Sequence, residues 1–81
     1  MKVLILSGQD WQGLYINGNL IDEGHVLGEG GATTYLLEKS EEYSFTLKDV
    51  KQSYVTDEDE QYLMEFGGFP SEQKELSGTY E

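Results

Sequence analysis

The alternation of apolar and polar residues predicts three β-strands in the first third of the chain. An apolar run occupies residues 1–7, and two further apolar-rich segments occupy residues 11–16 and 19–25. The last two are separated only by Asn17-Gly18. Asn-Gly in such a place is typical of a two-residue hairpin loop, because both residues accept the positive φ of a type I′ turn. We therefore expect a hairpin over residues 11–25.

The hairpin places apolar side chains on both of its faces. With Asn17-Gly18 as the loop, Tyr15 pairs with Leu20 and Leu14 pairs with Ile21. This pairing predicts a strand pair that is covered on both sides. One face would carry Trp11, Gly13, Tyr15, Leu20 and Asp22, and the other Leu14, Ile16, Ile21 and His25.

The middle of the chain is less clearly patterned. Several glycines in residues 26–31 indicate a flexible loop. Residues 32–39 favour a short helix that starts near the two threonines, although their Thr-Thr-Tyr-Leu-Leu core also has good β propensity and a strand stays an alternative. Residues 43–47 alternate apolar and polar side chains, which predicts a half-buried strand that continues, after a turn, into residues 50–55.

A second helix is predicted after Thr56. This residue can cap the helix, and the four acids at 57–60 fall in the first turn, where the helix dipole favours negative charge. Gly67-Gly68 would end the helix, and Pro70 prevents its continuation. Tyr62, Leu63 and Phe66 have helical spacing and are expected to pack against the sheet. Residues 71–76 can add one helical turn, and residues 77–81 are expected to form a frayed tail.

These elements predict one small α+β domain over residues 1–81. The expected sheet is antiparallel, has three to five strands including the N-terminal hairpin, and carries one or two helices on one face. A chain of 81 residues is too short for two self-supporting cores.

The charge balance restricts the partners that the chain can bind. Sixteen acidic residues oppose five lysines, arginine is absent, and the formal net charge is −11. Binding to nucleic acid or to an anionic membrane requires clustered basic residues, so neither is expected. Residues 56–81 hold eight acids and one lysine, whereas residues 1–55 hold eight acids and four lysines. The negative charge is therefore concentrated in the last third, although acidity can also serve solubility alone.

The sequence offers no convincing catalytic or cofactor site. Without cysteine there can be no disulfide and no thiolate metal site, which favours a reducing compartment, the cytoplasm. His25 is the single histidine; a general acid/base pair with Glu23 is conceivable, but a structural role at the end of a strand is favoured. The glycines of residues 28–31 lack the lysine of a phosphate-binding loop. The acids at 57–60 lack the ligand spacing of a calcium loop, so no metal, no cofactor and no enzymatic activity are expected.

Two segments resemble small proteins of bacteria and their phages that have no assigned activity. The first is the hairpin, with its Trp-Gln-Gly-Leu-Tyr start at Trp11 and its Asn-Gly turn; the second is residues 63–70, which end in Gly-Gly-Phe-Pro. The resemblance covers about a third of the chain and implies no catalytic residue. A phage origin would favour an inhibitor of a host protein.

We therefore expect a small acidic module that binds another protein without catalysis, and its charge would suit a basic partner. The alternative is a phage-type inhibitor whose negative charge imitates nucleic acid and blocks a basic host protein. The candidate partner-binding residues are Asp57, Glu58, Asp59, Glu60 and Glu65 on the second helix, which we expect in solvent, with Trp11 and Tyr15 on the hairpin. The two aromatic residues could instead belong to the core, together with Tyr35.

Overall fold

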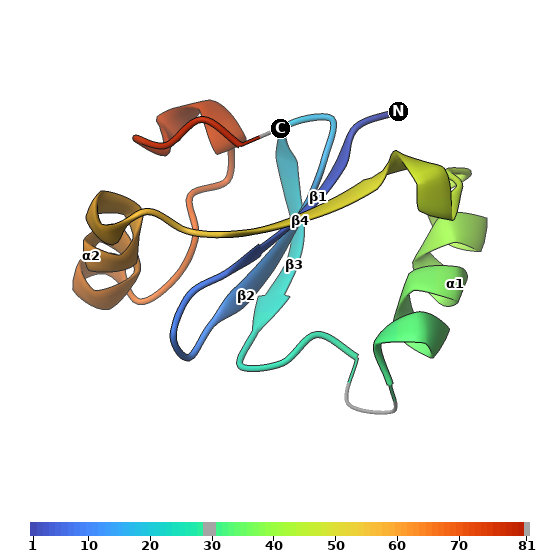
Figure 1. The fold of residues 1–81 in the computed structure, drawn as a ribbon, viewed down its shortest axis with the longest axis horizontal. Helices are drawn as coiled ribbons and strands as arrows, with labels where there is room; N and C mark the ends of the chain where they lie inside the picture. The colour runs from blue at the N-terminus through green and yellow to red at the C-terminus, as the bar shows by residue number, and fades with distance from the viewer. Residues whose placement is uncertain (29–30, 81) are drawn as a thin grey trace.

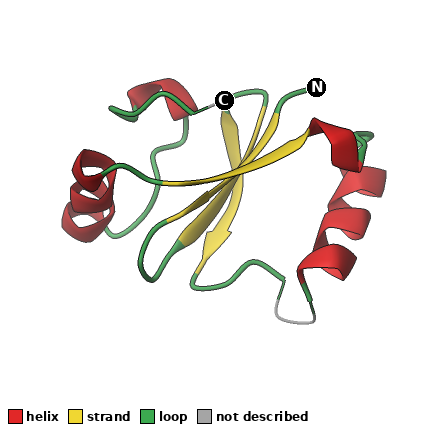
Figure 2. Cartoon of the chain, viewed as in Figure 1, coloured by secondary structure: helices red, strands yellow, loops and turns green. Residues whose placement is uncertain are grey.

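A computed structural model describes residues 1–28 and 31–80 and contains a four-stranded mixed sheet (Figures 1 and 2). The strands are β1 (Val3–Ser7), β2 (Gln12–Ile16), β3 (Asn19–Gly24) and β4 (Val50–Tyr54), in the spatial order β3-β2-β1-β4. β1, β2 and β3 form an antiparallel meander, whereas β4 runs parallel to β1. The predicted α+β class is confirmed, and the parallel fourth strand makes the sheet mixed.

The two helices lie on opposite sides of the sheet, as Figure 1 shows. Helix α1 spans Ala32–Tyr43 and helix α2 spans Asp57–Phe66. A short connection leads from α1 to β4, and another leads from β4 to α2. Successive side chains of a strand point to opposite faces, so β1 contributes to two separate cores. Val3 and Ile5 pack on the α1 side, and Leu4 and Leu6 on the α2 side. The prediction that the helices share one face is corrected here.

The Asn17-Gly18 turn forms as predicted. Both residues have positive φ, 51° and 84°. Tyr15 pairs with Leu20, but Leu14 lies opposite Asp22 because the register shifts between Leu14 and Tyr15. The predicted pairing of Leu14 with Ile21 is therefore replaced by a bulge.

The bulge reverses the predicted face of the residues that follow it. Ile21, the extra residue of the bulge, stays on its predicted face with Leu14 and Ile16, whereas Asp22 changes face and accepts a hydrogen bond from Tyr35 of α1 at 2.8 Å. Glu23 instead bonds groups of the α2-side core, among them Trp11. Asp22, predicted on the Trp11 face, thus lies on the other face.

Helix α1 is longer than the sequence predicted, and the strand expected over residues 43–47 does not form. The helix continues to Tyr43 and ends at Ser44, which has a left-handed φ of 60°. Tyr43 is seven residues after Leu36, so both lie on the helix face that packs on the sheet. After the reversal at Ser44, Phe45 is buried in the same core. Residues 26–28 follow β3 without forming a strand or a helix, and residues 29–30 of the predicted glycine loop lie outside the described residues.

The segment that follows α2 closes the β3 edge of the sheet. The Leu20 amide donates to the Ser71 carbonyl and the Gln73 amide to the Gly18 carbonyl, each at 2.8 Å. Phe69 packs against Gly13, where the Cβ of any side chain would lie only 2.6 Å from its ring. The predicted helical turn is the 3₁₀ helix η2 (Gln73–Glu75).

The predicted frayed tail is wrong for residues 77–80. Tyr80 is only 6% exposed and belongs to the α2-side core. Its hydroxyl accepts a hydrogen bond from the Thr56 amide at 2.9 Å and contacts Asp59. An aromatic anchor and a buried acceptor therefore order this segment; Glu81 lies outside the described residues.

Candidate protein-binding surface

Helix α2 concentrates acidic charge without any basic residue. Its ten residues include five acids, four of them in the first turn. The Thr56 hydroxyl accepts a hydrogen bond from the Asp59 amide at 3.3 Å, which confirms the predicted cap. The cap and the helix dipole together explain why a helix begins here despite four adjacent negative charges.

Asp59 is not part of the exposed acidic surface, contrary to the prediction. Its side chain is 1% exposed. The carboxylate accepts hydrogen bonds from the Ser77 amide at 2.7 Å, from the Gly78 amide at 2.9 Å and from the Tyr80 hydroxyl. Burial by itself would raise the pKa of Asp59, but these hydrogen bonds outweigh it and lower the pKa below its usual value. Asp59 is therefore an ionised structural residue that holds the C-terminal segment.

Glu60 also has a structural partner. Its Oε1 accepts a hydrogen bond from the Gln9 amide at 2.6 Å, which ties α2 to the loop between β1 and β2. The acids of α2 that remain fully exposed are Asp57, Glu58 and Glu65. The candidate acidic surface thus shrinks from five residues to three.

Apolar side chains flank the exposed acids. Met64 is 77% exposed and Phe66 is 66% exposed, whereas Phe66 was predicted to pack against the sheet. Of the predicted apolar set, Leu63 is buried, Tyr62 is half-buried, and the rings of Tyr62 and Phe66 lie 4.5 Å apart between centroids. The sequence prediction missed the exposure because Phe66 lies one turn after Leu63, a spacing that also fits the buried face.

Helical geometry arranges these residues into a stripe with two borders. Successive residues of an α-helix are rotated by about 100°. With Asp59 and Leu63 facing inward, the three acids and Gln61 occupy the outward side. Met64 then borders the acids on one side, and Tyr62 with Phe66 on the other. We call the surface formed by Asp57, Glu58, Gln61, Tyr62, Met64, Glu65 and Phe66 the α2 outer face.

The two aromatic candidates of the hairpin lie inside the α2-side core. Tyr15 is 0% exposed, donates a hydrogen bond from its hydroxyl to the Pro70 carbonyl at 2.6 Å, and contacts the Phe69 ring edge-on. It cannot contact a partner in this conformation. Trp11 is half-buried, and its indole N–H donates to Glu23 at 2.8 Å. Tyr35 lies on the opposite side of the sheet, so the predicted cluster of three aromatic residues does not form.

The histidine has a structural environment. His25 follows β3, its ring lies 4.8 Å from that of Trp11, and its Nδ1 lies 3.0 Å from the Asp10 carbonyl oxygen. Glu23, the conceivable acid/base partner, accepts hydrogen bonds from Trp11 and from the Phe69 amide, each at 2.8 Å. Its carboxylate joins the hairpin to the segment after α2.

Over residues 1–28 and 31–80, no group of three acidic or histidine side chains could hold a metal ion, and no helix is long and apolar enough to cross a membrane. Comparison with protein families, curated proteins and solved structures yields no match.

Proposed function

We propose that this chain is a non-catalytic binding module that uses the α2 outer face to bind a basic protein. The observation that carries the proposal is the combination of three exposed acids with two exposed, bulky apolar side chains on a helix without a basic residue. A complementary partner would present lysine or arginine between two apolar depressions.

The two kinds of side chain would contribute differently to binding. Burial of Met64 and Phe66 removes apolar surface from water and would supply most of the affinity. The acids would accelerate association by long-range attraction and would select against acidic partners. Exposed apolar side chains of this size on a charged helix are typical of interaction surfaces.

The salt dependence of binding through this face distinguishes the proposal from imitation of nucleic acid. A protein that imitates a phosphate row would bind through charge, and its affinity would fall steeply with salt. Binding through the α2 outer face should retain an apolar component at high salt. Loss of all binding at about 0.5 M NaCl, where charges beyond a few ångströms are screened, would favour nucleic-acid mimicry instead.

The experiment is a matched pair of charge variants, applied to a partner identified by photo-crosslinking from position 61. In the test variant Asp57, Glu58 and Glu65 become Asn, Gln and Gln, and in the control Glu38, Glu41 and Glu42 of α1 become Gln. Both sets are exposed, and each removes three negative charges. We expect the test variant to weaken binding at least about tenfold and the control to change it less than about twofold.

A second variant tests the apolar borders. Met64→Ser combined with Phe66→Ser should weaken binding at every salt concentration, because the lost contact is not electrostatic. Equal weakening by the α1 and α2 charge variants would show a response to net charge alone. Unchanged binding in both α2 variants would place the interface elsewhere and refute the proposal.

A further inference from the structure

Three of the five lysines of this acidic chain line one pocket. β1 and β4 run parallel, so their N-terminal ends lie side by side, with Val3 next to Val50. An open pocket of about 470 Å³ lies at this end of the sheet. Lys2, Lys48 and Lys51 line it from the start of β1, from the 3₁₀ helix η1 (Leu47–Asp49) and from β4, and Gln73 and Tyr80 line it from the C-terminal segment.

These three lysines have no acidic partner among the described residues. Within residues 1–28 and 31–80, the lysine ion pairs closer than 4.0 Å are Lys39 with Glu42 and Lys74 with Glu72. All three pocket lysines are exposed. In a chain with sixteen acids, three lysines without an ion-pair partner around one pocket make a local positive site.

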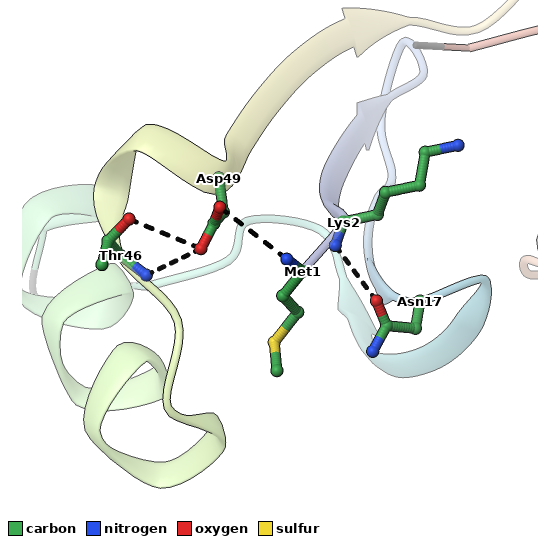
Figure 3. Close-up of polar contacts among 5 residues, drawn as sticks. All are labelled: Met1, Lys2, Asn17, Thr46 and Asp49. Atoms are coloured by element: carbon green, nitrogen blue, oxygen red, sulfur yellow. Dashed lines mark hydrogen bonds and ion pairs between the residues drawn. The ribbon is translucent and has the colours of Figure 1, made fainter.

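The backbone around the pocket is fixed by hydrogen bonds, as Figure 3 shows. The Lys2 amide donates to the Asn17 side-chain oxygen at 3.0 Å, and the Asn17 amide donates to the Lys2 carbonyl at 2.8 Å. On the opposite wall, the Thr46 amide donates to the Asp49 carboxylate at 3.0 Å and closes the first turn of η1. The backbone that carries the lysine side chains is therefore already ordered before a ligand binds.

Asp49 is the one carboxylate among the described residues that line this pocket, and it already has partners. Besides the Thr46 contacts, its Oδ1 lies 3.9 Å from the Met1 amino group (Figure 3). The hydrogen bond from the Thr46 backbone lowers the pKa of Asp49 from its ordinary value. The Asp49 carboxylate thus interacts with η1 and with the Met1 amino group. The three lysines leave the pocket with an excess of positive charge.

We propose that this pocket binds a small phosphate-bearing anion. Lysine ammonium groups act as point charges with rotatable donors, which suits a phosphate group, whereas planar carboxylates are matched best by arginine, which this chain lacks. The overall charge of −11 repels anions only weakly at this site, because the Debye length is about 8 Å at physiological ionic strength. The proposal is independent of the α2 outer face, which does not line the pocket.

The test is a titration of the full chain with inorganic pyrophosphate, followed by amide chemical shifts in NMR at constant ionic strength. We expect saturable shifts at Lys2, Lys48 and Lys51. The Lys48→Gln/Lys51→Gln variant should bind pyrophosphate at least about tenfold more weakly, since two of the three charges are gone. Lys39→Gln is the control for a lysine outside the pocket, because Lys39 lies on α1 and pairs with Glu42; it should bind like the unaltered chain.

Parallel titrations with citrate and with sodium chloride define the ligand class. Citrate carries comparable charge on carboxylates, so weaker binding of citrate than of pyrophosphate supports a phosphate site. Citrate binding of equal strength, shifts that do not saturate, or equal losses in the Lys39 and Lys48/Lys51 variants would overturn the proposal. Lys48 and Lys51 are exposed, whereas the Lys39 side chain is only 23% exposed, so well-dispersed spectra of each variant are needed to show that folding is unchanged.

Discussion

At the scale of single residues, Asp59 determines how the C-terminal segment is held. A buried carboxylate is costly unless it is hydrogen-bonded, and this one accepts bonds from two backbone amides and a tyrosine hydroxyl. Its own amide also donates to the helix cap Thr56. Asp59 therefore joins the start of α2 to residues 77–80, two segments that the sequence analysis treated as unrelated.

Replacing Asp59 with Asn should destabilise the fold by roughly 2 kcal/mol or more, because an amide offers one acceptor oxygen where two are used. The pKa of Asp59 is lowered on folding. The unfolded state therefore binds the proton more readily, so this contribution to stability is complete above the unfolded pKa of about 3.9 and is lost as pH falls through the folded pKa.

Urea unfolding between pH 2.5 and pH 7 measures this contribution. The stability difference between the unaltered chain and Asp59→Asn should be largest near neutral pH and shrink in acid. Glu58→Gln, a neighbouring exposed acid, is the control and should follow the unaltered chain. A difference that stays constant across this pH range would show that Asp59 stabilises the fold without its charge.

At the scale of elements, sequence signals predicted the structure well where the deciding contacts are between residues close in sequence. The Asn17-Gly18 turn, the Thr56 cap and the end of α2 at Gly67 all formed as predicted, because each depends on residues within one turn. The hairpin bulge could not be predicted in this way. It places Asp22 against Tyr35 and Glu23 against Trp11, and the first of these contacts exists only after α1 has packed on the sheet.

Two glycines of the hairpin allow a clean test of the turn. Gly18 and Gly24 both have open space where a side chain would begin, but only Gly18 has a positive φ, 84°. Gly18→Val should destabilise the domain by roughly 1 kcal/mol or more, since a β-branched residue resists this conformation. Gly24→Val should cost clearly less. Equal shifts of the denaturation midpoint in the two variants would contradict the turn-specific explanation.

The candidate surface was predicted only in part, for a related reason. Sequence spacing identified an acidic helix but could not distinguish Asp59, which faces Tyr80, from Asp57 and Glu58, which face outward. Phe66 has spacing suitable for the core, yet the chain turns away at Gly67 and leaves it exposed. Lys2 lies far in sequence from Lys48 and Lys51, and only the parallel pairing of β1 with β4 brings the three lysines to one pocket.

At the scale of the whole molecule, charge is distributed unevenly over a small body. The fold measures 33 × 24 × 17 Å and carries a formal net charge of −11. Among the described residues, Lys39 is the only lysine in an ion pair with any of the three exposed acids of α2 or the three of α1, whereas the pocket lysines lie near the start of β1 and β4. Such a molecule is destabilised by repulsion among its own carboxylates and attracts cations over most of its surface.

Stability should therefore rise with salt. Increasing NaCl from about 20 mM to about 500 mM shortens the Debye length from roughly 20 Å to about 4 Å and screens this repulsion. We expect a higher urea midpoint at the higher salt concentration. The variant with Asp57, Glu58 and Glu65 neutralised has a net charge of −11 + 3 = −8 and should gain less from salt.

Replacing part of the NaCl with pyrophosphate at equal ionic strength separates screening from binding. Screening affects all variants alike, whereas a ligand that binds only the folded state adds stability according to its concentration and affinity. The unaltered chain and the neutralised α2 variant should both gain extra stability, and the Lys48→Gln/Lys51→Gln variant should not. A midpoint that falls with NaCl would mean that attractive ion pairs outweigh repulsion, and would contradict the view of this molecule as one limited by its own negative charge.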